Sequence, residues 1–318
     1  MATLLKFGRN SLIHSEGFRQ VGKIIKSYNN PVVVLSGIGD TSNKLKHLLD
    51  NVKNGNHEMI THTMDDIHSE YHTIIDNLIL DAQANDDLKY ALDSILYRKL
   101  NTRNGLVKQL MQDSSNMDSS THYICNNIIS ISEQISCHIM SEYLNSHNNR
   151  FTQTINSQMI CGRDILLTTS LIHPYPIKIS DQYINHIIPP LIKNQITPII
   201  TNNYARDINN NVIRFGGSST NLTPMYIAGA LNINKLNIFN IHTDEYGEWS
   251  VEKNKASILN VLEQDTYIVN NLDTFTLGKT EQFDYSILKY LTKNTDMKIS
   301  IKNTMYPSYP GMKVVNNL

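Results

Sequence analysis

Short apolar runs that each end in a loop of small residues constrain the fold of this chain most. Thr3 to Phe7 and Pro31 to Leu35 are such runs, and Lys235 to Ile241 repeats the pattern later in the chain. Continuous β-branched and apolar segments are typical of strands buried on both faces of a parallel sheet. Helical patterns separate these runs, so strand and helix alternate. We therefore expect an α/β fold, a three-layer αβα sandwich with a mostly parallel central sheet.

The remaining elements are predicted from local patterns. Polar helical sequence without strand signals extends from His57 to about Asn101, and apolar residues at helical spacing extend from Tyr123 to Leu144. A further helix is predicted over 183–193, and another that opens at Gly216 and reaches Leu231. Further strands are predicted at 197–201, 212–215 and 297–302, and late helices at 257–263 and 283–294.

Composition excludes several classes of protein. The chain has 318 residues, of which 40 % are hydrophobic and 18 % charged, with a net charge of −1. A nucleic-acid-binding protein needs a basic surface, so no nucleic-acid partner is expected. No run of eighteen apolar residues is present, and the amino terminus carries no signal-peptide pattern, so we expect no membrane partner and a cytoplasmic location. Three scattered cysteines do not make a disulfide framework.

Four loops of small residues each follow an apolar run, at Gly8 to Ser11, Ser36 to Asp40, Gly216 to Ser218 and Thr243 to Gly247. In a parallel sheet these loops gather along one edge, where open α/β sheets bind their ligands. Glycines let backbone N–H groups approach an anion, and helix N-termini add positive field. With Lys6 as a point charge, the loops favour a polyphosphate beside a second anion, although none has the spacing of a Walker P-loop.

These loops carry a resemblance to the catalytic domain of aspartokinases, in the amino acid kinase superfamily. Lys6-Phe7-Gly8-Arg9-Asn10-Ser11-Leu12 resembles the opening Lys-Phe-Gly-Gly-Thr-Ser-Val of that family. Ser132-Glu133-Gln134-Ile135-Ser136 stands where the family has Gly-Glu-Leu-hydrophobic-Ser. Gly216-Gly217-Ser218-Ser219 is similar to Arg-Gly-Gly-Ser-Asp, and Thr243-Asp244-Glu245-Tyr246-Gly247 to Thr-Asp-Val-x-Gly. The match follows the family's order along nearly the whole chain.

The resemblance implies a function and a domain organisation. It implies an ATP- and Mg²⁺-dependent kinase of amino-acid biosynthesis that phosphorylates the side-chain carboxylate of aspartate, or of an aspartate derivative, to an acyl phosphate. One domain over 1–318 is implied, with a substrate lobe at about 1–200, a nucleotide lobe at about 201–318 and no ACT regulatory domain. The family also implies an amino acid as the small-molecule substrate, and a homodimer.

The resemblance also assigns roles to residues, and no residue is assigned to a metal. The catalytic group is Lys6, Gly8 and Ser11. The substrate-binding group is Ser36, Glu133, Ser218 and Arg214, with Glu133 on the substrate's amino group. The nucleotide-binding group is Gly8, Gly37, Gly216, Gly217, Thr243, Asp244, Gly247, Lys253 and Lys255.

Several charged residues of the family motif are replaced here. Phe215 stands where the family has the arginine that anchors the substrate's α-carboxylate, and Ser219 and Asn254 replace other site residues. Arg214 is adjacent, but neighbours in an extended chain point to opposite faces, so it is expected to substitute only through a bulge or a register change. Each lost donor costs about 3–4 kcal/mol of transition-state stabilisation. A catalytically weak or inactive homologue that acts as a binding or assembly partner therefore stays open as the alternative.

Histidines suggest a competing interpretation. His68 and His72 are four residues apart on a predicted helix, so they share a face and have the spacing to bind a transition metal. The order His-x-Glu-x-His differs from that of zinc proteases. His122, Cys125, Cys137 and His138 fit no standard zinc spacing. An ordinary polar helix and ordinary core packing are the favoured interpretations.

Overall fold

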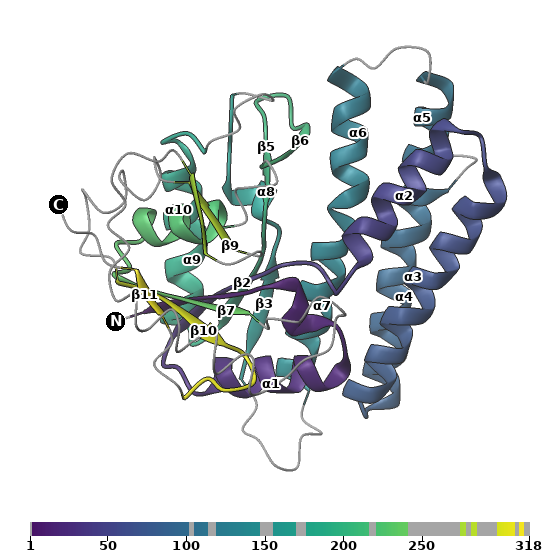
Figure 1. Ribbon diagram of the computed structural model, residues 1–318. Coiled ribbons are helices and arrows are strands. Elements are labelled where there is room, and N and C mark those ends of the chain that lie inside the picture. Colours follow the sequence, from purple (N-terminus) through teal and green to yellow (C-terminus); the bar gives the residue numbers. More distant parts are fainter. Residues whose placement is uncertain are drawn as a thin grey trace.

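A seven-stranded sheet lies at the centre of the computed structural model (Figure 1). The structure describes residues 2–101, 105–113, 119–146, 155–169, 176–215, 221–240, 274–277, 281–284, 298–308 and 312–314. The strands of the sheet are β1 (Thr3–Phe7), β2 (Pro31–Leu35), β3 (Ser157–Ile160), β4 (Thr197–Thr201), β7 (Lys235–Asn240), β10 (Lys298–Asn303) and β11 (Met312–Val314). Their order is β11-β10-β7-β1-β2-β4-β3, and every pair is parallel except β10 with β11.

Helices cover both faces of the sheet. One face carries α8 (Gly162–Ile165), α9 (Ser180–Lys193) and α10 (Leu222–Ala230). The other carries α1 (Ser15–Lys26) and α7 (Ile131–Asn145). Beside them stands a group of helices, visible to one side of the sheet in Figure 1. This group consists of α2 (Thr41–Lys53), α3 (His57–Leu78), α4 (Ala82–Leu100), α5 (Leu106–Asp113) and α6 (Ser119–Ile129).

Alternation along the strands builds a separate hydrophobic core on each face. In β1, Leu5 and Phe7 pack on the α1–α7 side, whereas Leu4 packs with α9 and α10. All five residues of β1 are buried, as are all five of β2. The predicted three-layer αβα sandwich with a mostly parallel sheet is therefore confirmed.

Two short hairpins lie outside the central sheet. The strands β5 (Tyr204–Arg206) and β6 (Val212–Arg214) pair antiparallel, as do β8 (Thr274–Leu277) and β9 (Glu281–Asp284). The hairpin of β5 and β6 packs against α6, where the Asn126 side-chain amide donates to the Val212 carbonyl at 3.2 Å.

Element boundaries differ from the sequence predictions at a few places. The helix expected from Tyr123 to Leu144 is divided at Ser130, whose hydroxyl donates to the Asn127 carbonyl at 2.7 Å and competes with the helical hydrogen bonds. Phe283 begins no helix but belongs to strand β9, and β11 was not predicted. The helix predicted at 257–263, and residues 285–294 of the helix predicted at 283–294, lie outside the described residues. None of the described helices is both long and apolar enough to span a bilayer.

Candidate functional site

The carboxyl ends of four parallel strands meet at one edge of the sheet. Backbone hydrogen bonds continue past the strand ends and hold the following loops side by side. Gly8 N–H donates to the Phe239 carbonyl at 2.9 Å, and Ser36 N–H donates to the Phe7 carbonyl at 3.1 Å. Asn202 N–H donates to the Leu35 carbonyl at 3.1 Å. This edge therefore brings together the first two of the four loops predicted from the sequence.

Lys6, Gly8 and Ser11 lie within one turn at the end of β1. The Lys6 side chain is 2 % exposed and lies on the same face of β1 as Leu4. Gly8 lies so close to β7 that a Cβ atom there would be 2.6 Å from Asn240 Oδ1. Ser11 lies in the 3₁₀ turn Arg9–Leu12, where its buried hydroxyl is 2.6 Å from Thr304 Oγ1. The structure thus places the buried Lys6 two residues before a glycine that packs closely against the Asn240 side chain.

The loop after β2 is held against the first turn of α7. A Cβ atom on Gly37 would lie 1.8 Å from Ser132 Oγ, so only glycine fits there. Ser136 Oγ donates to the Ser36 carbonyl at 2.8 Å, and Ser42 Oγ donates to Ser132 Oγ at 3.0 Å. These contacts fix the position of the first turn of α7, which carries Glu133 directly after Ser132.

Glu133 is a buried carboxyl group at the start of α7, with 4 % of its surface exposed. Burial raises the pKa of Glu133 from 4.5 to about 8, against the opposing charges of Arg214 and Lys46. Within the described part of the chain, Glu133 Oε2 has no hydrogen-bond partner. A buried polar atom without a partner costs stability, so its presence points to a ligand that supplies the missing donor.

Arg214 ends β6 and its charge acts on Glu133. The pairing of β6 with β5 is regular, with Arg214 opposite Tyr204, so the structure shows no bulge in this hairpin. Phe215 turns the other way, is 1 % exposed and belongs to the core beneath α9 and α10. Arg214 therefore acts on Glu133 without a bulge in this hairpin, and its substitution for the family's arginine, expected through a bulge or a register change, stays a prediction. Arg214 Nε is itself buried and has no hydrogen-bond partner among the described residues.

Three further residues near Glu133 were not assigned from the sequence. Burial and the charge of Glu133 raise the pKa of the Tyr204 hydroxyl well above its usual range, and the Arg214 guanidinium lowers it in part. Burial and the charges of Arg214 and Arg9 lower the pKa of Lys46. The charges of Arg214 and Lys46 thus act on the buried carboxyl of Glu133, and the charge of Arg9 acts on Lys46. Only Arg9 had a sequence signal, as a cation gained within the first loop, because lysine on a helix and tyrosine on a short strand are common.

The other predicted site residues cannot be placed. Two of the four predicted loops, Gly216 to Ser218 and Thr243 to Gly247, therefore stay predictions from the sequence. The members that lie outside the described residues are Gly216, Gly217, Ser218, Thr243, Asp244, Gly247, Lys253 and Lys255.

A surface hollow lies at the opposite, amino-terminal edge of the sheet. Its lining includes Lys26, Tyr28, Pro31, Asn156 and Thr197. It contains none of the predicted site residues, and parallel sheets bind ligands at the carboxyl ends of their strands. The carboxyl edge is therefore the stronger candidate.

Comparisons with known proteins give the chain's relatives. The family model described as "Amino acid kinase family" matches residues 1–247. No curated protein matches. Escherichia coli aspartokinase III with lysine and aspartate (T-state) superposes with a TM-score of 0.73 at 16 % identity, over 100 % of this chain and 65 % of that chain. The same enzyme with aspartate and ADP (R-state) gives a TM-score of 0.70 at 14 % identity, with the same coverage.

Clostridium acetobutylicum aspartate kinase gives a TM-score of 0.65 at 17 % identity, over 99 % of this chain and 62 % of that chain. The chain spans less than two thirds of the length of each of these structures. At such low identity these similarities show the fold alone.

Proposed function

This chain belongs to the amino acid kinase family, and from that membership we propose that it is an ATP-dependent kinase that phosphorylates the side-chain carboxylate of aspartate or of an aspartate derivative. The observation that supports an amino acid as substrate is the buried carboxyl of Glu133, whose Oε2 atom has no hydrogen-bond partner among the described residues and on which the charges of Arg214 and Lys46 act. In this reaction an oxygen of the substrate carboxylate forms a bond to the γ-phosphorus of ATP while the bond between that phosphorus and ADP breaks. The product is an acyl phosphate.

Glu133 is proposed to bind the substrate's ammonium group. A salt bridge of this kind supplies hydrogen-bond donors to the buried Oε2 atom and replaces the lost hydration of the carboxylate. In the absence of substrate the raised pKa keeps much of this carboxyl protonated at neutral pH. Binding of an ammonium ion then favours the ionised form.

Arg214 is proposed to bind the α-carboxylate in place of the family's arginine. Its charge acts on Glu133 and on Tyr204, so the guanidinium and the carboxyl face a common space. An arginine fork and a carboxylate make two parallel hydrogen bonds. Lys46 and Arg9 add positive charge that favours a substrate with two carboxylates.

Lys6, Gly8 and Ser11 are proposed to act at the transferred phosphoryl group. ATP supplies that group when it is bound, and Mg²⁺ neutralises part of the phosphate charge. The buried Lys6 and the Gly8 turn lie at the carboxyl end of β1, where phosphate oxygens are proposed to bind, and Ser36 and Gly37 lie on the neighbouring loop. Gly216, Gly217, Ser218, Thr243, Asp244, Gly247, Lys253 and Lys255 stay proposals from the resemblance.

The direct test is turnover by the purified full chain. We expect ADP release with ATP, Mg²⁺ and one member of a panel of aspartate and its derivatives, and hydroxylamine should trap the acyl phosphate. Lys6→Ala should abolish this activity. Lys26→Ala, at the opposite edge of the sheet, should leave it unchanged. Absence of turnover across the panel would contradict the proposal.

A catalytically weak or inactive homologue is the second candidate. Phe215 occupies the family's arginine position and is part of the core, so the proposed contact with the α-carboxylate depends on Arg214 in its place. Thermal unfolding with ATP and Mg²⁺, with and without aspartate, distinguishes the two. A raised Tm without any turnover favours the inactive homologue, whereas an unchanged Tm disfavours both. The homodimer that the resemblance implies is testable by light scattering on the same sample.

A further inference from the structure

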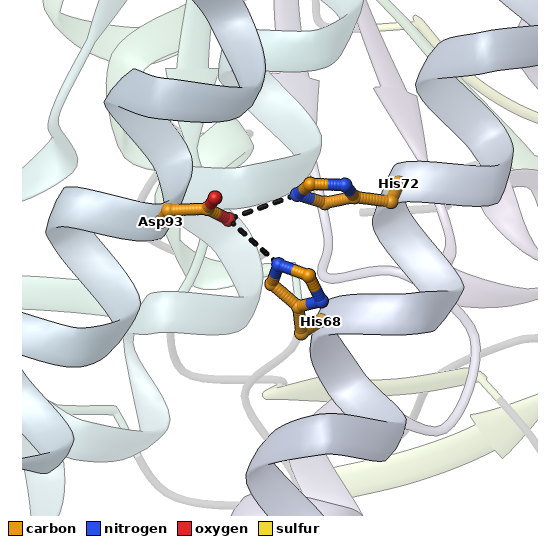
Figure 2. Close-up of side chains that lie close together, drawn as sticks. All are labelled: His68, His72 and Asp93. Carbon is orange, nitrogen blue, oxygen red and sulfur yellow. Dashed lines mark hydrogen bonds and ion pairs between the residues drawn. The ribbon is translucent and has the colours of Figure 1, made fainter.

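Two histidines of α3 and an aspartate of α4 meet between these two helices (Figure 2). His68 and His72 are one helical turn apart, and their ring centroids are 3.9 Å apart. Both rings direct Nε2 toward Asp93, at 3.3 Å from Oδ1 for His68 and 2.9 Å for His72. The three ligand atoms all lie within 4.8 Å of one another.

These separations match those between the ligands of a single metal ion. Bonds of about 2.0–2.1 Å place two ligand atoms about 3.3 Å apart at a tetrahedral angle and about 2.9 Å apart at a right angle. The two Nε2–Oδ1 distances fall in this range, and the two imidazoles offer ligand atoms within 4.8 Å of each other, so an ion would draw the rings together. All three side chains are partly exposed, with 30 %, 23 % and 30 % of their surface accessible, so an ion and its remaining water ligands have access.

The aspartate also has an outer partner of the kind that metal ligands have. The Tyr71 hydroxyl, on a side chain that is 1 % exposed, donates to Asp93 Oδ1 at 2.5 Å. The His72 ring nitrogen lies 2.9 Å from the same oxygen, so contacts from α3 hold the carboxylate in place.

We propose that His68, His72 and Asp93 form a binding site for a late first-row divalent cation, Zn²⁺ or a relative such as Co²⁺ or Ni²⁺. Two imidazoles and one carboxylate are ligands that these ions prefer, and they leave at least one position open to water. The ion joins α3 to α4. This site does not depend on the kinase proposal.

The test is metal binding by the untagged full chain after treatment with a chelator. We expect one Co²⁺ per chain, with the intense visible absorption of a site of low coordination number, and displacement of Co²⁺ by Zn²⁺. Zn²⁺ should raise the Tm, and the rise should grow with the logarithm of its concentration. Tyr71→Phe, which removes only the outer partner, should weaken binding about 10–100-fold.

His72→Gln and His62→Gln form a matched pair of variants. The amide of His72→Gln can still donate a hydrogen bond to Asp93, so the contact between α3 and α4 in the metal-free protein is kept. This variant should nevertheless weaken Co²⁺ binding at least as much as Tyr71→Phe. His62 is on the same helix and pairs only with the exposed Asp66, at 3.2 Å, so His62→Gln should bind normally. Circular dichroism checks that each variant folds. Equal Co²⁺ affinity in the wild type and His72→Gln, or equal loss in both variants, would overturn the proposal.

Discussion

At the scale of single residues, the site is organised around one group whose burial is unfavourable by itself. Glu133 begins α7 with its carboxyl enclosed, and the described part of the chain offers its Oε2 atom no donor. The neighbouring charges of Arg214 and Lys46 lower its pKa without overcoming the effect of burial. Such an arrangement lowers the stability of the empty protein and favours a cationic ligand.

Glu133→Gln should make the free energy of unfolding less dependent on pH. The pKa of Glu133 is about 8 in the folded protein and about 4.5 in the unfolded chain, so the folded protein holds a proton that the unfolded chain releases. The stability that this proton contributes is fully present below the unfolded pKa of 4.5 and is lost as pH rises to the folded pKa of about 8. The free energy of unfolding falls by up to about 1.4 kcal/mol per pH unit between these two values. Urea unfolding at several pH values in this range measures the fall.

The variant Glu58→Gln is the control for that measurement, because Glu58 is exposed in the first turn of α3. It should follow the pH dependence of the wild type. If Glu133→Gln also showed the pH dependence of the wild type, the carboxyl of Glu133 would not be buried as the structure has it.

Arg214→Met should weaken substrate binding and change its pH dependence. Loss of a charged hydrogen-bond donor costs about 1.5–3 kcal/mol, which raises the KM for the amino acid about 10–150-fold. Because the guanidinium also lowers the pKa of Glu133, its removal should shift the pH profile of kcat/KM to higher pH. Arg206→Met is the matched control, since the Arg206 guanidinium lies over the Tyr183 ring at 5.2 Å. The same rise in KM for both variants would contradict this role.

At the scale of elements, the site depends on how the first turn of α7 packs on the loop after β2. Gly37 allows Ser132 to approach, and Ser136 and Ser42 complete the contact. The loop and the helix are about a hundred residues apart in sequence. Their contact is what places Glu133 at the carboxyl edge of the sheet.

Gly37→Ala should destabilise the protein by about 1–3 kcal/mol, because the added methyl group would lie 1.8 Å from Ser132 Oγ and 2.9 Å from Ser132 Cβ. Ser132→Ala in the same chain removes the closer contact and should restore part of the stability. Gly55→Ala is the control. Its φ of +68° carries a strain of its own, but nothing lies within 4 Å of the added carbon, so Ser132→Ala should not rescue it. Urea unfolding of the wild type, Gly37→Ala, Ser132→Ala and the double variant measures the coupling between the two positions. Additive effects would show that residues 37 and 132 are not in contact.

The sequence predicts the elements well where local chemistry determines them. The bounds of β1, β2 and β4 are those expected from apolar runs that end at turn residues. The division between α6 and α7 was missed because apolar spacing continues through Ser130. The strand at Phe283 was missed because a short run between polar residues has no clear period.

The candidate site is predictable only in part, for a similar reason. Lys6, Gly8 and Glu133 stand in motifs, whereas Tyr204 and Lys46 reach the site through tertiary packing that no local pattern encodes. In the same way, the spacing of His68 and His72 is visible in the sequence. Asp93 joins them only because α3 and α4 pack together.

At the scale of the whole molecule, the sheet brings the first and last parts of the chain to the same edge. β7 lies between β1 and β10, so the turn after β1 meets the residues that follow β10. Thr304 N–H donates to the Asn240 carbonyl at 3.0 Å, and Gln20 Nε2 donates to the Thr304 carbonyl at 3.2 Å. The position of Ser11, proposed to act at the phosphoryl group, therefore depends on a strand nearly three hundred residues later.

Thr304→Val should destabilise the protein and, through Ser11, impair its activity. The two hydroxyls are buried and 2.6 Å apart, so valine leaves Ser11 Oγ without this partner, at a cost of about 1–3 kcal/mol. Ser11→Ala/Thr304→Val removes both polar groups and should be less unstable than the sum of the single variants. Ser27→Ala, which removes a local hydrogen bond to the Ile24 carbonyl, should add independently to Thr304→Val. Urea unfolding of these chains checks the prediction, and additivity of Ser11→Ala with Thr304→Val would show that the ends of β1 and β10 are not coupled through these hydroxyls.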